Sequence, residues 1–207
     1  GALEATGFPF PTEPAAPLAP ELDLFLRSGL PPLVFTAGTA NRGSQAFYAE
    51  SAAACARGGH RGVLVAASAD QVPAALPEGV LHVTRAPFES LLPRAAGIVH
   101  HAGIGTLAQA LAAGIPQLLR PMAYDQFDNA DLACRLGVAI ELLPRAYQGP
   151  RLDDALCRLT TASAWRARCA TAAQTLAQPG GVEAACDVLE RTMREHHSRP
   201  ETASHTA

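Results

Sequence analysis

The sequence has 207 residues, of which 48% are hydrophobic and 17% are charged, and its formal net charge is −3. This length predicts one folded domain with a single apolar core. All 16 cationic side chains are arginines. The lack of lysine excludes a P-loop, a pyridoxal Schiff base and a lysine nucleophile, so any bound phosphate needs other donors.

The charge pattern and the apolar runs exclude further classes. The arginines are scattered, so the sequence predicts no nucleic-acid partner. The long uncharged run 95–119 contains His100, His101 and Pro116, so it predicts a strand, a turn and a helix, and no integral membrane segment. The five cysteines occur singly and no secretory signal is visible, which favours a reducing, cytoplasmic location.

Both ends of the chain differ in composition from its centre. Residues 1–20 are rich in proline and predict an interdomain linker, and residues 21–195 predict the folded domain. Residues 196–207 are polar and aperiodic and predict a disordered tail, so His196 and His197 are interpreted as solvated residues and no metal site is expected.

From residue 22 onward, apolar runs and helical patterns alternate. A short amphipathic turn at Leu22–Leu26 precedes six predicted strands, at Leu33–Thr36, Gly62–Ala67, Val80–Thr84, Gly97–His101, Gln117–Arg120 and Val138–Leu142. Predicted helices cover Ser44–Arg57, Leu107–Ala113, Gln126–Leu136, Leu152–Leu159, Ala164–Ala177 and Val182–Met193. This alternation predicts an α/β fold: a Rossmann-like, parallel six-stranded sheet with helices on both faces.

The segment Val99–Thr106 has the composition of a phosphate-binding loop. It leaves a buried strand and enters an alanine-rich helix, and Gly103 and Gly105 let the backbone turn and an anion approach. Thr106 is predicted to cap the helix, whose free N–H groups bind anions, and His101 adds a donor. The alternative is a tight turn with core histidines.

The segment Thr36–Ser44 is a second loop rich in glycine and hydroxyl groups. The backbone of this loop, Gly38 included, offers N–H groups, and Thr39 or Ser44 offers a hydroxyl, to the same phosphates. The alternative is an ordinary helix cap at Ser44.

The segment Pro121–Ala130 places a carboxylate beside an amide at a helix start. Asp125 and Gln126 are therefore candidates for binding sugar hydroxyls, because a carboxylate accepts hydrogen bonds and an amide both donates and accepts. The alternative is that Asp125 only caps the helix.

The segment Arg85–Pro93 is predicted to be an exposed loop that lays Pro87 and Phe88 beside a base. Alternatively, Phe88 belongs to the core.

Taken in order, these segments resemble the C-terminal, donor-binding domain of a GT-B glycosyltransferase. The family is the one that contains macrolide, sterol, plant secondary-metabolite and rhamnolipid transferases. The resemblance extends from Gly7 to about Met193 and is most specific in 100–106, 110–117, Asp125–Gln126 and Asn129–Ala130. The stretch 119–129 most resembles the rhamnosyltransferase branch.

The resemblance implies a role for each loop. His101, Gly105 and Thr106 contact the nucleotide diphosphate, and Asp125 and Gln126 bind the donor sugar. The loop with Gly38 and Thr39 closes on the phosphates, and the loop with Arg85, Ala86, Pro87 and Phe88 lies by the base and ribose.

Two positions depart from the family pattern. Ala102 replaces the first glycine of the usual His-His-Gly-Gly, and Arg85 stands where plant members have the aromatic residue that stacks on the base. The sequence therefore leaves the base open between uracil and thymine.

The resemblance implies an inverting transfer of a glucose- or rhamnose-type hexose from a UDP- or dTDP-sugar to a small-molecule or lipid hydroxyl. The nucleotide sugar is a co-substrate, and no other cofactor is expected. The general base belongs to an N-terminal acceptor-binding domain, so no catalytic residue is assigned here and the chain alone is expected to be inactive. The alternatives are an epimerase-like enzyme on the same fold and a donor-binding subunit completed by a separate chain.

Overall fold

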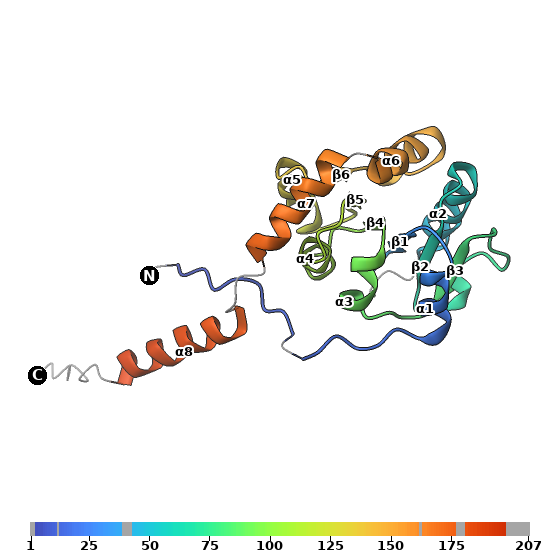
Figure 1. Cartoon of the computed structure of the whole chain (residues 1–207). Coiled ribbons are helices and arrows are strands. Elements are labelled where there is room, and N and C mark those ends of the chain that lie inside the picture. The colour runs from blue at the N-terminus through green and yellow to red at the C-terminus, as the bar shows by residue number, and fades with distance from the viewer. Residues whose placement is uncertain (1–2, 12, 39–42, 162, 177–180, 198–207) are drawn as a thin grey trace, which may run out of the picture. The chain divides into compact units, whose positions relative to one another are not determined.

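The computed structural model describes residues 3–11, 13–38, 43–161, 163–176 and 181–197 (Figure 1). Within these ranges, six strands form one sheet: β1 (Leu33–Thr36), β2 (Gly62–Val65), β3 (Val80–Val83), β4 (Gly97–His100), β5 (Gln117–Leu119) and β6 (Ala139–Glu141). All six were predicted. β1 has the predicted bounds, and the others end one or two residues earlier than expected.

The strand order is β3-β2-β1-β4-β5-β6, and every pair of neighbours is parallel. This is the order of the dinucleotide-binding Rossmann fold. The chain builds the sheet outward from β1 to β3 on one side and then returns to add β4 to β6 on the other, so the topological switch point lies between β1 and β4. The loops that follow these two strands diverge there. In open α/β sheets this point is where ligands bind.

Helices cover both faces of the sheet, as predicted. The helices of the described chain are α1 (Pro20–Arg27), α2 (Gln45–Gly58), α3 (Phe88–Leu91), α4 (Ile104–Ala112), α5 (Gln126–Arg135), α6 (Gly149–Thr161), α7 (Ser163–Leu176) and α8 (Gly181–His197). The short 3₁₀ helices are η1 (Ala69–Gln71), η2 (Leu92–Arg94) and η3 (Pro144–Ala146). The predicted turn at Leu22–Leu26 is the middle of a full helix.

Alternation along the strands divides the core into two layers. Phe35, Leu64 and Val99 pack on the face covered by α2 and α6. Val34 and Ile98 pack on the opposite face, with α1, α3 and α4. These side chains are fully buried, and burial of each contributes about 1.5–3 kcal/mol. Beside β5 and β6, a third cluster joins α4, α5 and α7.

The chain forms two compact units. The larger covers Pro14–Thr175 and contains the whole sheet. The smaller joins residues 1–13 to 176–207, and in its described part Arg191 pairs with Glu4 and the backbone of Gly181 lies close against Phe8. The domain boundaries predicted at residues 20 and 195 stay predictions.

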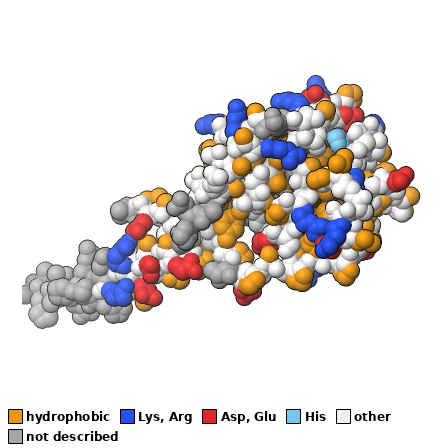
Figure 2. Space-filling model, in the orientation of Figure 1, with side chains coloured by type: hydrophobic (Ala, Val, Ile, Leu, Met, Phe, Trp, Pro, Cys, Tyr) orange, Lys and Arg blue, Asp and Glu red, His pale blue; other side chains and the backbone are white. Residues whose placement is uncertain are grey.

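The surface carries charges of both signs. On the face in Figure 2, basic and acidic side chains lie among apolar ones. In the described part of the chain, no helix is both long and apolar enough to cross a membrane.

Candidate functional site

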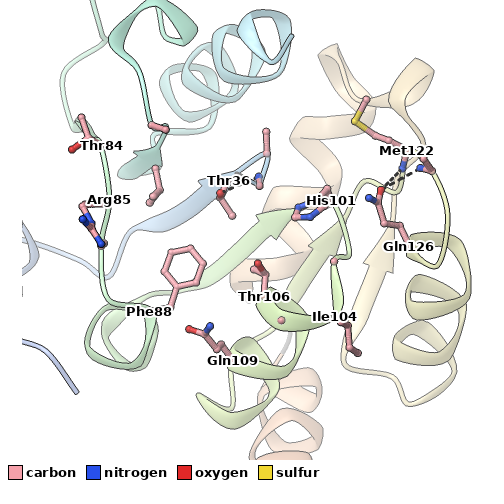
Figure 3. A pocket seen from close by; sticks show the side chains of 18 residues that line it. Thr36, Thr84, Arg85, Phe88, His101, Ile104, Thr106, Gln109, Met122 and Gln126 are labelled. Atoms are coloured by element: carbon pink, nitrogen blue, oxygen red, sulfur yellow. Dashed lines mark hydrogen bonds between the residues drawn. The ribbon is translucent and has the colours of Figure 1, made fainter. Parts of the chain in front are cut away.

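A cavity of about 670 Å³ lies at the carboxyl end of the sheet (Figure 3), within the size range of small-molecule sites. The loops after β1, β2, β3, β4 and β5 all contribute to it. Its lining residues are Thr36, Ala37, Gly38, Val65, Ala67, Thr84, Arg85, Ala86, Phe88, His101, Gly103, Ile104, Gly105, Thr106, Gln109, Met122, Ala123 and Gln126. Residues predicted for the diphosphate, the sugar and the base therefore meet in one cavity.

The loop after β4 brings the start of α4 to this cavity. Gly103 is the N-cap residue and has extended backbone angles, so the first helical residue is Ile104. The prediction that Thr106 caps the helix is wrong, because Thr106 lies within the first turn. Because the N-cap residue is a glycine, no side chain caps the N–H groups of the first turn. Such groups bind anions.

The His101 ring lies between two glycines. A Cβ at Gly38 would lie 2.5 Å from His101 Cε1, and a Cβ at Gly103 would lie 2.4 Å from its Nε2. Gly38 also has a φ of 84°, which other residues rarely adopt. Both positions therefore require glycine for the ring to reach the cavity.

The charge state of His101 follows from its surroundings. Burial lowers its pKa, and the Asp125 carboxylate opposes this shift. Its Nδ1 atom is buried and has no hydrogen-bond partner among the described residues. The lowered pKa keeps the imidazole predominantly neutral at pH 7.

His100 lies beneath this loop and does not line the cavity. Its Nδ1 accepts the N–H of Ala102 at 3.2 Å, so its Nε2 carries the proton and donates to Gln117 Oε1 at 2.9 Å. Full burial lowers its pKa to about 4. The first histidine of the pair is thus the core residue, and the second faces the cavity.

Gln126 shapes the loop after β5. Its Oε1 accepts the N–H groups of Met122 at 2.9 Å and Ala123 at 3.2 Å (Figure 3). Because the oxygen is engaged, the Nε2 group is what Gln126 offers to a ligand in the cavity. The next residue in this loop, Tyr124, has a φ of 57° and is exposed.

Asp125 lies at the N-cap position of α5 but makes no side-chain capping bond. Its Oδ2 accepts a hydrogen bond from Asn129 Nδ2 at 2.8 Å. The carboxylate is exposed, next in sequence to the cavity-lining Gln126, and is not itself among the lining residues. The capping alternative is therefore wrong, and the sugar-binding role stays a prediction.

The loop after β3 differs in part from the expectation. Arg85, Ala86 and Phe88 line the cavity, whereas Pro87 does not. The segment was predicted to be an exposed loop, but α3 and η2 occupy 88–94. This prediction is wrong because Leu91 and Leu92 are fully buried in the core and fold the segment against it.

Ser44 and Thr39 were also predicted to contact the diphosphate. Ser44 is buried at the N-cap position of α2 and does not line the cavity. Thr39 lies outside the described residues. Their contacts with a ligand stay predictions.

Sequence reasoning missed some polar lining residues. Thr36 is the last residue of β1, and Thr84 follows β3. Gln109 lies on α4 with its amide toward the cavity (Figure 3). Gln109 follows Thr106 by three residues, and this spacing places both on one face of a helix. This spacing in the sequence could have indicated that Gln109 faces the same cavity as Thr106.

Arg120 is a half-buried cation close to this site. It lies near the rings of Phe47 (5.7 Å) and Tyr147 (5.4 Å), and its Nη1 lies 3.1 Å from Met122 Sδ. Burial lowers its pKa from the ordinary value, and its Nε has no hydrogen-bond partner in the described part. The two aromatic rings stabilise the guanidinium charge of Arg120, which forms no ion pair with a carboxylate among the described residues.

Comparison with known proteins gives consistent matches. Residues 59–191 match the family model described as "Erythromycin biosynthesis protein CIII-like, C-terminal domain". The O-mycaminosyltylonolide 6-deoxyallosyltransferase of Streptomyces fradiae is 35% identical over 192 residues, which are 92% of this chain and 45% of that enzyme. A sterol 3-beta-glucosyltransferase of Yarrowia lipolytica is 32% identical over 118 residues, 57% of this chain and 8% of that enzyme.

A solved structure agrees with the fold. The calicheamicin glycosyltransferase CalG4 superposes with a TM-score of 0.70 and 27% identity, over 81% of this chain and 44% of that one. This chain thus spans about half the length of the Streptomyces fradiae enzyme and of CalG4. It belongs to the EryCIII-like family, as a C-terminal domain of the GT-B glycosyltransferases that include macrolide and sterol glycosyltransferases.

Proposed function

We propose that this domain binds the nucleotide-sugar donor of an inverting glycosyltransferase. The observation that carries the proposal is the cavity at the switch point, where His101, the Gly38 turn and the start of α4 meet. The donor is a UDP- or dTDP-linked hexose of glucose or rhamnose type, and the acceptor is a small-molecule or lipid hydroxyl.

The diphosphate lies over the start of α4. The N–H groups of the first turn, with the positive end of the helix dipole, bind its oxygens, and the Thr106 hydroxyl and the His101 imidazole add donors. Their preorganised dipoles stabilise the negative charge that grows on the departing diphosphate. His101 therefore acts electrostatically and does not abstract a proton.

The base and the sugar occupy opposite ends of the cavity. Arg85, Ala86 and Phe88 line the base end, and Gln126 lines the sugar end. The Gln126 amide donates to one sugar hydroxyl, and Asp125 accepts from others. No described residue is assigned the general-base role, so we expect the domain alone to bind the donor without transferring the sugar.

Calorimetric titration with UDP, dTDP and their glucose conjugates tests this proposal. At least one of them is expected to bind, and the His101→Ala variant is expected to bind it about tenfold more weakly. His60→Ala is the control, because His60 lies before β2 at the other end of the sheet and outside this cavity. A folded domain that binds none of these ligands at about 1 mM contradicts the proposal.

A further inference from the structure

Ala102 has a backbone conformation that alanine rarely adopts. Its φ is 64°, and the residue is completely buried between His101 and Gly103. A Cβ disfavours this left-handed region, so the conformation persists only where the surroundings impose it. The peptide groups on both sides of Ala102 set the direction in which the chain leaves β4 for the start of α4.

Hydrogen bonds on both sides hold Ala102 in place. Its N–H donates to His100 Nδ1 at 3.2 Å, and its carbonyl oxygen accepts from Asn129 Nδ2 at 3.0 Å. The His100 ring is fixed in turn by Gln117. Two side chains, one from β4 and one from α5, thus satisfy both backbone groups of the strained residue.

The same amide nitrogen of Asn129 also reaches the start of its own helix. Nδ2 donates to Asp125 Oδ2 at 2.8 Å. An amide nitrogen has two hydrogens, so one is available for the Ala102 carbonyl and the other for the Asp125 carboxylate. Of the polar side chains, only asparagine or glutamine provides two such donors on one uncharged planar group, and glutamine is longer by one methylene group.

We propose that Asn129 is a positioning residue for donor binding, which fixes the phosphate-binding loop at Ala102 and the Asp125 carboxylate relative to each other through one amide. The inference rests on the proposed function, because Asp125 and this loop bind the donor there. Asn129 touches no ligand in this role. It acts by holding two ligand-binding elements at a set separation.

This role predicts that a second substitution, Ala102→Gly, restores the loop but not the position of the Asp125 carboxylate in a variant that lacks Asn129. Asn129→Ala frees both of them. Adding Ala102→Gly lets the backbone adopt the positive φ without strain, so the loop recovers its shape, but it gives Asp125 no new donor. A merely structural role for Asn129 in packing α5 predicts no rescue by a glycine on another element.

The first test is a cycle of thermal unfolding for wild type, Asn129→Ala, Ala102→Gly and the double variant. We expect Asn129→Ala to lower the melting temperature less when Ala102→Gly is already present than when it is made in the wild type. Equal losses in both backgrounds contradict the link between Asn129 and Ala102. The control is Asp131→Ala, since Asp131 is exposed on the same helix and pairs only with Arg135 among the described residues.

The second test measures the affinities of the same proteins for UDP, UDP-glucose, dTDP and dTDP-glucose. Asn129→Ala is expected to weaken diphosphate binding about tenfold, and Ala102→Gly is expected to restore most of it. The additional affinity due to the sugar is expected to stay lost in the double variant. Wild-type affinities for both ligand types in Asn129→Ala overturn the positioning role, as does a double variant that binds diphosphate no better than Asn129→Ala. If wild type binds none of the four ligands, the proposed function fails instead.

Discussion

The imidazole of His101 occupies the space that a side chain at position 38 would need. The Cβ of such a side chain would lie 2.5 Å from His101 Cε1, far inside van der Waals contact. Gly38 follows β1 and His101 follows β4, and these strands are neighbours at the switch point of the sheet. The glycine in the loop after β1 therefore leaves the space that the His101 ring, in the loop after β4, occupies.

Gly38→Ala is expected to weaken diphosphate binding about tenfold or more, because it displaces His101, and to lower stability by about 1–3 kcal/mol through strain at positive φ. Calorimetry and urea unfolding measure the two effects. Gly59→Ala is the matched control, since Gly59 has a φ of 62° but nothing within 4 Å of its Cβ. It is expected to lose stability without losing affinity. Equal affinity in Gly38→Ala and wild type contradicts the steric argument.

The buried His100 predicts a stability that falls in mild acid. Its pKa is about 4 in the folded protein, against an ordinary value of 6.5. Above pH 6.5 the residue is neutral in both states and its contribution is complete. As the pH falls from 6.5 to about 4, only the unfolded chain takes up the proton, so the free energy of unfolding decreases by up to about 3 kcal/mol.

Urea unfolding between pH 7.5 and 4 checks this dependence, in wild type and in His100→Gln. Because glutamine does not titrate, the free energy of unfolding of the variant is expected to fall less toward pH 4. At neutral pH the variant is expected to be less stable than wild type, because it lacks the buried imidazole. Parallel pH profiles for the two proteins contradict the assignment to His100.

Gln126→Glu separates the two roles of that side chain. A glutamate still accepts the N–H groups of Met122 and Ala123 but has no N–H₂ group for the sugar. We expect the added negative charge to weaken UDP and UDP-glucose binding alike, and in addition a loss of about tenfold in the affinity due to the sugar. Parallel titrations with UDP and UDP-glucose, and with the dTDP pair, provide the measurement. An unchanged sugar contribution contradicts the role of the amide.

Tyr48→Phe is expected to lower stability by about 1–3 kcal/mol. The buried phenol accepts the N–H of Ala37 at 3.1 Å and donates to the carbonyl of Val65 at 2.7 Å, so it joins the ends of β1 and β2. Its removal leaves both backbone groups without this partner. Tyr124→Phe, at a side chain that is 91% exposed, is expected to have no effect on urea unfolding. A similar change in both variants contradicts the argument.

Patterns local in the sequence predicted the sheet and the central loop. Each strand is a short apolar run bounded by glycine, proline or polar residues, and burial on both faces of a parallel sheet produces such runs. Gly103 and Gly105 indicated where the chain leaves β4. The expectation that the phosphate and sugar loops meet in one cavity needed only the strand assignments and the rule that ligands bind at the carboxyl ends of strands.

The remaining features depend on contacts between distant residues. The helix α3 has only four residues and forms because Leu91 and Leu92 enter the core. The start of α4 lies two residues before Thr106, since Gly103 takes the N-cap position with no side-chain bond. The bond from Asn129 to Ala102 spans 27 residues and has no signal in hydrophobic periodicity.

Gln126 shapes its own loop and lines the cavity, so under the proposed function it limits how sugar preference can evolve. A substitution at 126 that changes the recognised hydroxyl also removes the acceptor that Met122 and Ala123 need, unless the new residue keeps an oxygen at that place. Met122 and Ala123 are bound to Gln126 only through their backbones in these two bonds, while their side chains line the cavity. Variation among relatives with different sugars is therefore expected to accumulate at positions 122 and 123 before it reaches 126.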